Sequence, residues 1–120
     1  MHELSLAQNI LEIVQQYVPK GQEKSVKTIK LRIGELAAVV PESLEFCFSS
    51  IVAGTLLSDS TLEIERVPFT LECRKCNSTV ASRMGIVVCP RCGSEDTEVI
   101  AGTEMRVVEI ELWDPVAETI

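Results

Sequence analysis

Four cysteines occur as two closely spaced pairs, and thiolates at this spacing are typical metal ligands. Cys73 and Cys76 form the first CxxC pair, and Cys89 and Cys92 form the second after twelve intervening residues. A CxxC turn places two sulfurs on one side of a metal, and two such turns complete the closed tetrahedral site that holds structural zinc. The spacing therefore predicts a zinc ribbon. Iron in the same four-sulfur geometry and a dithiol redox pair remain the alternatives.

The residues that follow each pair support two metal-binding turns. Gly93 comes directly after the second pair, where the turn needs a residue that tolerates positive φ. Asn77 holds the corresponding place after the first pair and is the next best choice. One Zn(II) ion and four thiolates together carry a formal charge of about −2. We expect Arg74, Lys75 and Arg91 to offset it, because they lie close in sequence.

A second set of candidate metal ligands lies at the start of the chain. The single histidine, His2, stands between Met1 and Glu3. A free α-amino group has a pKa of about 7.7–8.0, so it loses its proton readily to a metal. The amine, the peptide nitrogen between Met1 and His2, and the imidazole can close two fused chelate rings in one plane. Planar nitrogen coordination suits Ni(II) or Cu(II), whereas zinc prefers a tetrahedron. Position alone favours an ordinary solvated terminal residue.

Signatures of catalysis are missing from the sequence. It contains no glycine-rich phosphate loop, no serine–histidine–aspartate set and no HExxH motif. Cys47 falls on the apolar side of an expected helix, and the sole histidine is far away in sequence, so we interpret Cys47 as a small buried hydrophobe. The sequence therefore predicts a protein that is not an enzyme.

The charge balance argues against nucleic acid as a partner. The chain carries 18 acidic and 11 basic residues, for a net charge of −7. Sequence-independent binding to nucleic acid relies on lysine and arginine to neutralise phosphates. No signal peptide and no apolar run long enough to span a membrane is found. We expect a cytoplasmic protein, and in that compartment four close cysteines indicate metal rather than disulfides.

Hydrophobic periodicity predicts the elements that carry these residues. Residues 3–18 follow a helical pattern, and Pro41 begins a second helix. Alternating residues predict strands at 26–34, 61–67 and 103–112. The first helix has an expected buried stripe at Leu4, Ala7, Leu11, Val14 and Val18, with Ile10 and Tyr17 alongside. The strand at 26–34 has an expected buried face of Ile29, Leu31 and Ile33, and the second helix one of Leu44, Cys47, Phe48, Ile51 and Val52.

The order of elements predicts an α+β fold with an insert. We expect a small three-stranded antiparallel sheet with two helices, formed by residues 1–67 and 103–120, plus an inserted zinc-ribbon domain at 68–102. An insert of this size cannot build a self-sufficient apolar core, so its fold should depend on the metal.

Several short motifs, taken together, resemble one protein family. Besides the opening Met1-His2-Glu3, the motifs are LRIGEL at 31–36, PESLEF at 41–46, CRKC at 73–76, CPRCGS at 89–94 and AGTEMRVVEIE at 101–111. This linear set resembles the HypA/HybF family of hydrogenase nickel-incorporation proteins over essentially the whole chain.

The resemblance implies a nickel metallochaperone that delivers Ni(II) to the [NiFe]-hydrogenase large subunit. It implies a nickel site at Met1, His2 and Glu3, and a structural zinc site at the four paired cysteines. It also implies a HypB-type GTPase as partner and, in some relatives, urease maturation factors. A monomer and a homodimer both stay open. Two other functions also stay open: a zinc-ribbon adaptor without a nickel role, and a nucleic-acid-binding ribbon that the acidic balance disfavours.

Overall fold

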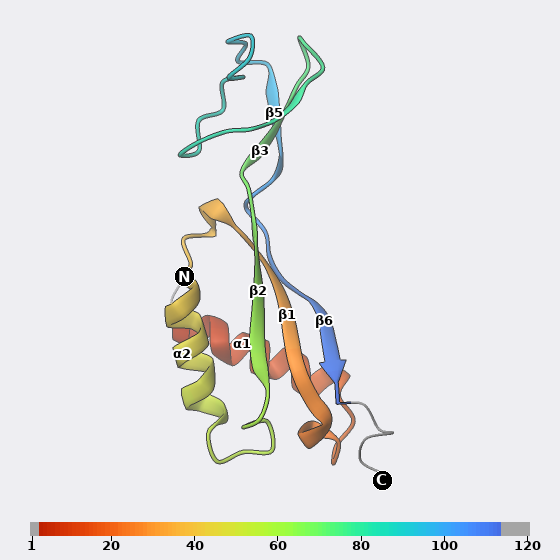
Figure 1. Cartoon of the computed structure of the whole chain (residues 1–120). Coiled ribbons are helices and arrows are strands. Elements are labelled where there is room, and N and C mark those ends of the chain that lie inside the picture. The colour runs from red at the N-terminus through yellow and green to blue at the C-terminus, as the bar shows by residue number, and fades with distance from the viewer. Residues whose placement is uncertain (1–2, 114–120) are drawn as a thin grey trace. The chain divides into compact units, whose positions relative to one another are not determined.

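The structure is a computed structural model that describes residues 3–113 (Figure 1). Its helices are α1 (Glu3–Tyr17) and α2 (Pro41–Val52), with short 3-10 turns η1 (Glu23–Ser25) and η2 (Glu35–Ala37). Its strands are β1 (Val26–Gly34), β2 (Thr61–Val67), β3 (Thr70–Cys73), β4 (Thr79–Ala81), β5 (Thr97–Ala101) and β6 (Met105–Leu112).

The chain divides into two compact units. The first contains Met1–Leu31, Val39–Ile64 and Val107–Ile120, and the second contains Arg32–Ala38 and Glu65–Arg106. These units differ from the expected domains by grouping residues 32–38, 65–67 and 103–106 with the cysteine segment. The expected zinc-ribbon domain at 68–102 stays a prediction.

The first sheet has the strand order β2-β1-β6. The ion pairs Lys27–Glu111 and Lys30–Glu109 show that β6 runs opposite to β1, because the numbering rises on one strand as it falls on the other. By contrast, β2 follows α2 and runs in the same direction as β1 (Figure 1). A helical crossover returns the chain to the same end of a sheet, which gives parallel neighbours. The expectation of an antiparallel sheet therefore holds for β1 and β6, and the three-stranded sheet is mixed.

Helix α1 buries a slightly different stripe from the expected one. Leu4 is 43% exposed and Tyr17 is 75% exposed, whereas Leu6 is buried. The expected positions Ala7, Val14 and Val18 are buried. Leu11, which was also expected in the stripe, is only half-buried. The stripe is rotated because the row of positions four residues apart that begins at Leu6 faces the core. The buried residues of the helix are Leu6, Ala7, Ile10 and Val14.

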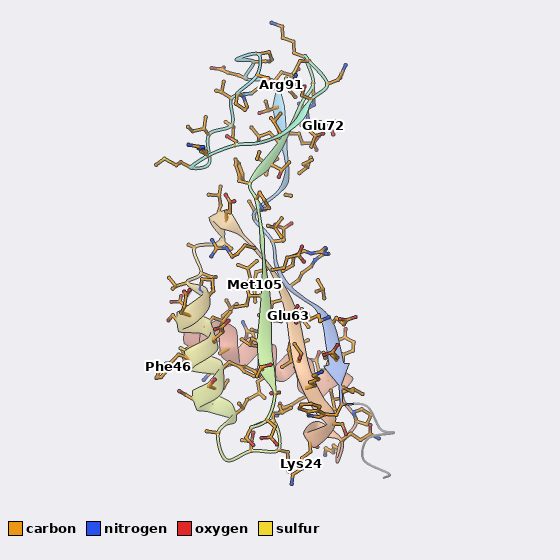
Figure 2. The ribbon with its side chains drawn as sticks, in the orientation of Figure 1. Lys24, Phe46, Glu63, Glu72, Arg91 and Met105 are labelled. Carbon is orange, nitrogen blue, oxygen red and sulfur yellow. The ribbon has the colours of Figure 1, made fainter. Side chains whose placement is uncertain are left out.

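Helix α2 begins at Pro41, as expected, and packs one face into the core. Leu44, Phe48 and Val52 are buried, while Cys47 is only half-buried. Phe46 is 73% exposed and projects from the side of α2 that faces away from β2 (Figure 2). Cys47 thus lies at the margin of the core rather than inside it.

The expected buried face of β1 is confirmed. Ile29, Leu31 and Ile33 have no exposed surface, which fits a strand that packs one face against helices.

The second sheet has the order β4-β3-β5, and both of its strand pairs are antiparallel. The α+β class, with two helices, small sheets and a ribbon that carries the four paired cysteines, is confirmed. Within residues 3–113, no helix is long and apolar enough to cross a membrane.

Candidate metal centre

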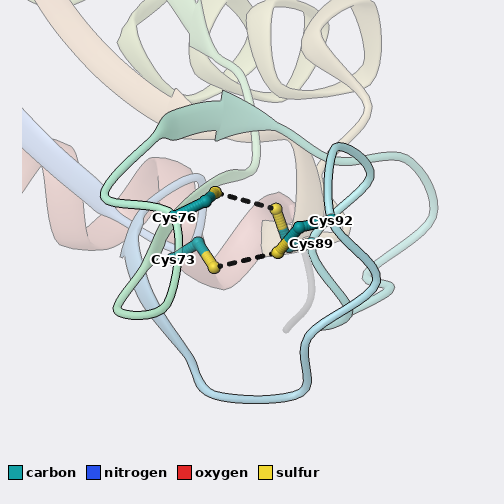
Figure 3. A group of neighbouring side chains, drawn as sticks. All are labelled: Cys73, Cys76, Cys89 and Cys92. Carbon is teal, nitrogen blue, oxygen red and sulfur yellow. Dashed lines mark hydrogen bonds between the residues drawn. The ribbon is translucent and has the colours of Figure 1, made fainter.

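The structure brings the four paired cysteines together (Figure 3). All four sulfurs lie within 4.8 Å of one another, and the closest pairs are Cys73–Cys92 at 3.6 Å and Cys76–Cys89 at 3.8 Å. Four sulfurs at a zinc–sulfur distance of about 2.3 Å would lie about 3.8 Å apart along the edges of a tetrahedron. The side-chain arrangement therefore fits a tetrahedral metal of the zinc-ribbon type.

Both cysteine turns use the same backbone hydrogen bond. The Cys73 N–H donates to the Ser78 carbonyl, and the Cys89 N–H donates to the Ser94 carbonyl, each at 2.9 Å. The repeated bond folds each CxxC segment back on itself. Two turns of the same shape thus present their sulfurs to one point.

The two residues expected to take positive φ do so. Asn77 has φ 59° and Gly93 has φ 77°. In the second turn the Gly93 N–H donates to the Cys89 carbonyl at 2.8 Å. The sequence pattern thus predicted the local backbone of both turns correctly.

The environment of the thiols separates their acidities. Hydrogen bonds from the side chain and backbone of Ser78 lower the pKa of Cys76 to about 6. A hydrogen bond from the Cys92 backbone lowers the pKa of Cys89. The Ser94 backbone N–H also lowers the pKa of Cys92, but partial burial and the neighbouring sulfurs outweigh it and raise that pKa to about 11. Four sulfurs this close do not all carry charge without a cation, and a bound divalent metal removes that conflict.

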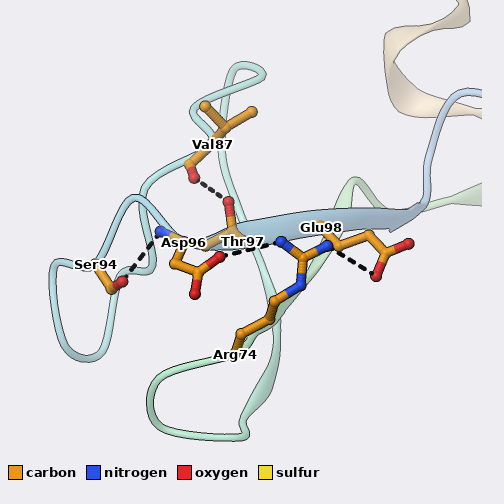
Figure 4. A network of polar contacts seen from close by, with 6 residues as sticks. All are labelled: Arg74, Val87, Ser94, Asp96, Thr97 and Glu98. Carbon is orange, nitrogen blue, oxygen red and sulfur yellow. Dashed lines mark hydrogen bonds and ion pairs between the residues drawn. The ribbon is translucent and has the colours of Figure 1, made fainter.

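Two of the basic residues near the cysteines have other partners, and Figure 4 shows those of Arg74. Arg74 forms ion pairs with Asp96 at 3.0 Å and Glu98 at 3.5 Å. The hydrogen bond to Asp96 raises the pKa of Arg74. Arg91 donates to the Ser78 hydroxyl at 3.2 Å, so it joins the two turns. The expected role of Arg74 in offsetting thiolate charge is therefore wrong in part, because two carboxylates already balance that guanidinium.

Two sequence motifs, LRIGEL and AGTE, meet in the second unit. The Gly34 N–H donates to the Glu104 carbonyl at 2.7 Å, and the Leu36 N–H donates to the Gly102 carbonyl at 2.9 Å. The Gly102 N–H donates to the Glu104 carboxylate at 2.7 Å. Glu104's own backbone N–H and that of Gly102 lower the pKa of this carboxyl. These bonds fix the segment that leads from β5 to β6.

The same contact leaves no room for a side chain at two glycines. A Cβ at Gly34 would lie 2.1 Å from the Gly102 carbonyl carbon. A Cβ at Gly102, where φ is +107°, would lie 2.3 Å from the Phe69 Cα. This contact was not predicted from the sequence. Its only signal was a glycine in each of the two motifs.

The candidate nickel ligands lie at the edge of the described residues. Met1 and His2 fall outside residues 3–113, while Glu3 is the first residue of α1 and is half-buried. The expectation that the three act together stays a prediction.

Comparisons with known proteins agree on one family. A family model described as "Hydrogenase/urease nickel incorporation, metallochaperone, hypA" matches residues 1–112. A "Hydrogenase maturation factor HypA" of Geobacter sulfurreducens is 41% identical over 112 residues, which are 93% of this chain and 99% of that protein. The protein of the same name from Azotobacter chroococcum is 40% identical over the same shares.

Solved structures with the same fold are also found. The solution structure of the nickel metallochaperone HypA from Helicobacter pylori has a TM-score of 0.64 and 24% identity, and it covers 94% of this chain and 98% of its own. A second solution structure of a HypA protein has a TM-score of 0.66 and 24% identity, with 93% and 96% covered. At this identity the likeness shows the fold alone.

Proposed function

Because the chain belongs to the HypA family of hydrogenase/urease nickel-incorporation metallochaperones, we propose that it binds Ni(II) at its N-terminus and delivers it to a [NiFe]-hydrogenase large subunit. The observation that carries this proposal is the family match over residues 1–112, which includes the opening Met1-His2-Glu3. The protein acts as a carrier and not as an enzyme. Nickel is its cargo.

The four paired cysteines hold a structural zinc ion in this proposal. Support comes from the sulfur spacing and from two turns of the same shape. Sites of this kind contribute roughly 10–16 kcal/mol of apparent binding energy. The ribbon from β3 to β5 has few buried apolar residues, among them Leu71 of β3. The zinc ion therefore supplies much of what holds the ribbon together.

The nickel site is built from groups at the chain terminus. The α-amino group of Met1, the peptide nitrogen of His2 and the His2 imidazole form a planar set of nitrogen ligands, and Glu3 offers a carboxylate. Since His2 is the only histidine of the chain, a second imidazole is not available and the backbone must contribute. Planar coordination selects nickel over zinc, while the four-sulfur site selects zinc.

The same ligands also allow nickel to be released. A site on a chain terminus lets the ligands of an acceptor approach and replace the original ligands one at a time. Nickel uptake weakens as the pH falls, because protons compete with nickel for the nitrogen atoms of the amine, the amide and the imidazole. A drop in pH thus favours the unloaded protein.

In this proposal the protein binds a HypB-type GTPase and the hydrogenase large subunit. Urease maturation factors are a second set of partners. The protein acts in the cytoplasm, as a monomer or a homodimer. Nucleic acid and membranes are not partners, in keeping with the net charge of −7.

Replacement of the histidine tests the proposal. In zinc-loaded protein with a native N-terminus, His2→Ala should abolish nickel binding in calorimetry, while zinc content and circular dichroism stay unchanged. Gln8→Ala, which changes an exposed residue of α1, serves as the matched control and should bind nickel like the parent protein. Unchanged nickel affinity in His2→Ala would instead favour a zinc-ribbon adaptor without a nickel role.

A further inference from the structure

One continuous segment of the first unit carries acidic side chains and no basic ones. Residues 39–64 comprise α2, the turns after it and the first four residues of β2. They contain four carboxylates and no lysine, arginine or histidine. The carboxylates belong to Glu42, Glu45, Asp59 and Glu63. Lys30 of β1 lies near Glu63 but already pairs with Glu109 at 2.9 Å. The segment therefore keeps a negative charge that attracts a cationic partner and repels an anionic one.

The strand of this segment lies at the edge of its sheet. The order β2-β1-β6 pairs β2 with β1 alone. Within residues 3–113, the backbone of Thr61–Ile64 forms no backbone hydrogen bond beyond the sheet itself. An edge strand with unpaired N–H and C=O groups is a template for an added strand. The carboxylate of Glu63 opposes pairing with the same edge of a second copy, because like charges would meet.

An open hollow lies where α2 approaches this strand. Its volume is about 190 Å³, and a water molecule occupies about 30 Å³ in the liquid, so the hollow has room for an aliphatic side chain. Leu62 in its lining is half-buried, so it offers apolar surface to a side chain that enters. The lining residues are Glu45, Phe48, Ser49, Thr61 and Leu62. The hollow thus combines the apolar side chain of Leu62 with a carboxylate and two hydroxyl groups.

We propose that the Thr61–Ile64 edge binds an extended segment of a partner protein in which aliphatic residues alternate with lysine or arginine. Successive side chains of an added strand point to opposite faces of the sheet. One set would lie on the side of Leu62 and enter the hollow. The other set would lie on the side of Glu63, which is labelled in Figure 2. None of the residues of this surface is a proposed nickel ligand.

A short peptide tests the proposal on the full, zinc-loaded chain. The probe is a capped peptide of alternating lysine and valine, and the control is the same peptide with glutamate in place of lysine. The lysine peptide should shift the amide resonances of Thr61–Ile64 and slow their hydrogen exchange. The glutamate peptide should do neither. Shifts elsewhere only, or equal binding of both peptides, would overturn the proposal.

A charge reversal separates this surface from general electrostatic attraction. Glu63→Lys should weaken the lysine peptide roughly three- to tenfold, the effect of reversing one exposed charge beside a cation. Glu12→Lys changes an exposed carboxylate on α1 and should leave the affinity within about twofold, since that charge is outside the site. Equal loss in both variants, or protection of the edge by a second copy without peptide, would contradict the proposal. Nickel affinity should be unchanged in both variants. A negative result for the peptide would therefore leave the nickel proposal standing, and the reverse also holds.

Discussion

A methyl group added at Gly34 or Gly102 should destabilise the second unit strongly. At Gly34 the backbone is ordinary for any residue, with φ −68° and ψ 151°, so the whole cost is steric. The new Cβ would lie 2.1 Å from the Gly102 carbonyl carbon, whereas carbon atoms pack at about 3.5–4.0 Å. One backbone segment must therefore move by more than about 1 Å. Overpacking of this kind costs about 1–3 kcal/mol or more.

At Gly102 the steric cost adds to a backbone cost. The positive φ of +107° costs a residue with a side chain about 1–2 kcal/mol. Contact with the Phe69 backbone at 2.3 Å adds about 1–3 kcal/mol. Gly102→Ala should therefore lose about 2–5 kcal/mol in all. Gly54→Ala is the matched control, because Gly54 has φ +75° with nothing within 4 Å of the new Cβ.

Hydrogen exchange of the Leu36 amide measures this contact locally, since that N–H donates to the Gly102 carbonyl. Urea denaturation of zinc-loaded protein measures the global effect. Both Gly34→Ala and Gly102→Ala should speed the exchange and lower the denaturation midpoint, whereas Gly54→Ala should lose about 1 kcal/mol with normal exchange at Leu36. A steric conflict at these two glycines is ruled out if Gly34→Ala is as stable as the parent, or if Gly54→Ala loses as much stability as Gly102→Ala.

Three further predictions concern the second unit. Removal of zinc by a chelator, or Cys73→Ser, should remove the exchange protection of β3, β4 and β5, because the ribbon depends on the metal; retained protection would show that it does not. Arg74→Ala should change stability far less than Leu71→Ala, since exposed ion pairs contribute little and truncation of a buried leucine costs about 2–5 kcal/mol in urea denaturation. Glu104 has a lowered pKa, so its contribution to stability is complete above about pH 4.3, its unfolded value, and is lost as the pH falls through the folded value. A carbon NMR titration that places its pKa at or above the ordinary value would contradict the last prediction.

Local patterns predicted local structure well. The alternation of Ile29, Leu31 and Ile33 predicted a buried strand face because a strand repeats every two residues, and all three are buried. Asn77 and Gly93 were predicted to take positive φ because few other residues tolerate it, and both do.

Contacts between distant segments could not be predicted in this way. The packing of Gly34 on Gly102 and the ion pair of Arg74 with Asp96 join residues far apart in sequence. The direction of β2 depends on how α2 crosses the sheet, which periodicity does not encode. The buried stripe of α1 includes Leu6 rather than Leu4, since the face of a helix that packs is chosen by its neighbours. In each case the missing information is tertiary.

The nickel affinity of the chain with and without one additional residue before Met1 shows directly whether the terminal amine binds nickel. The extra residue converts the terminal amine into an amide and leaves His2, Glu3 and the zinc ribbon in place. If the amine is a nickel ligand, calorimetry of zinc-loaded protein should show nickel binding weakened by at least about tenfold, or about 1.4 kcal/mol. Equal nickel affinity for the two proteins would contradict a nickel site built on the chain terminus.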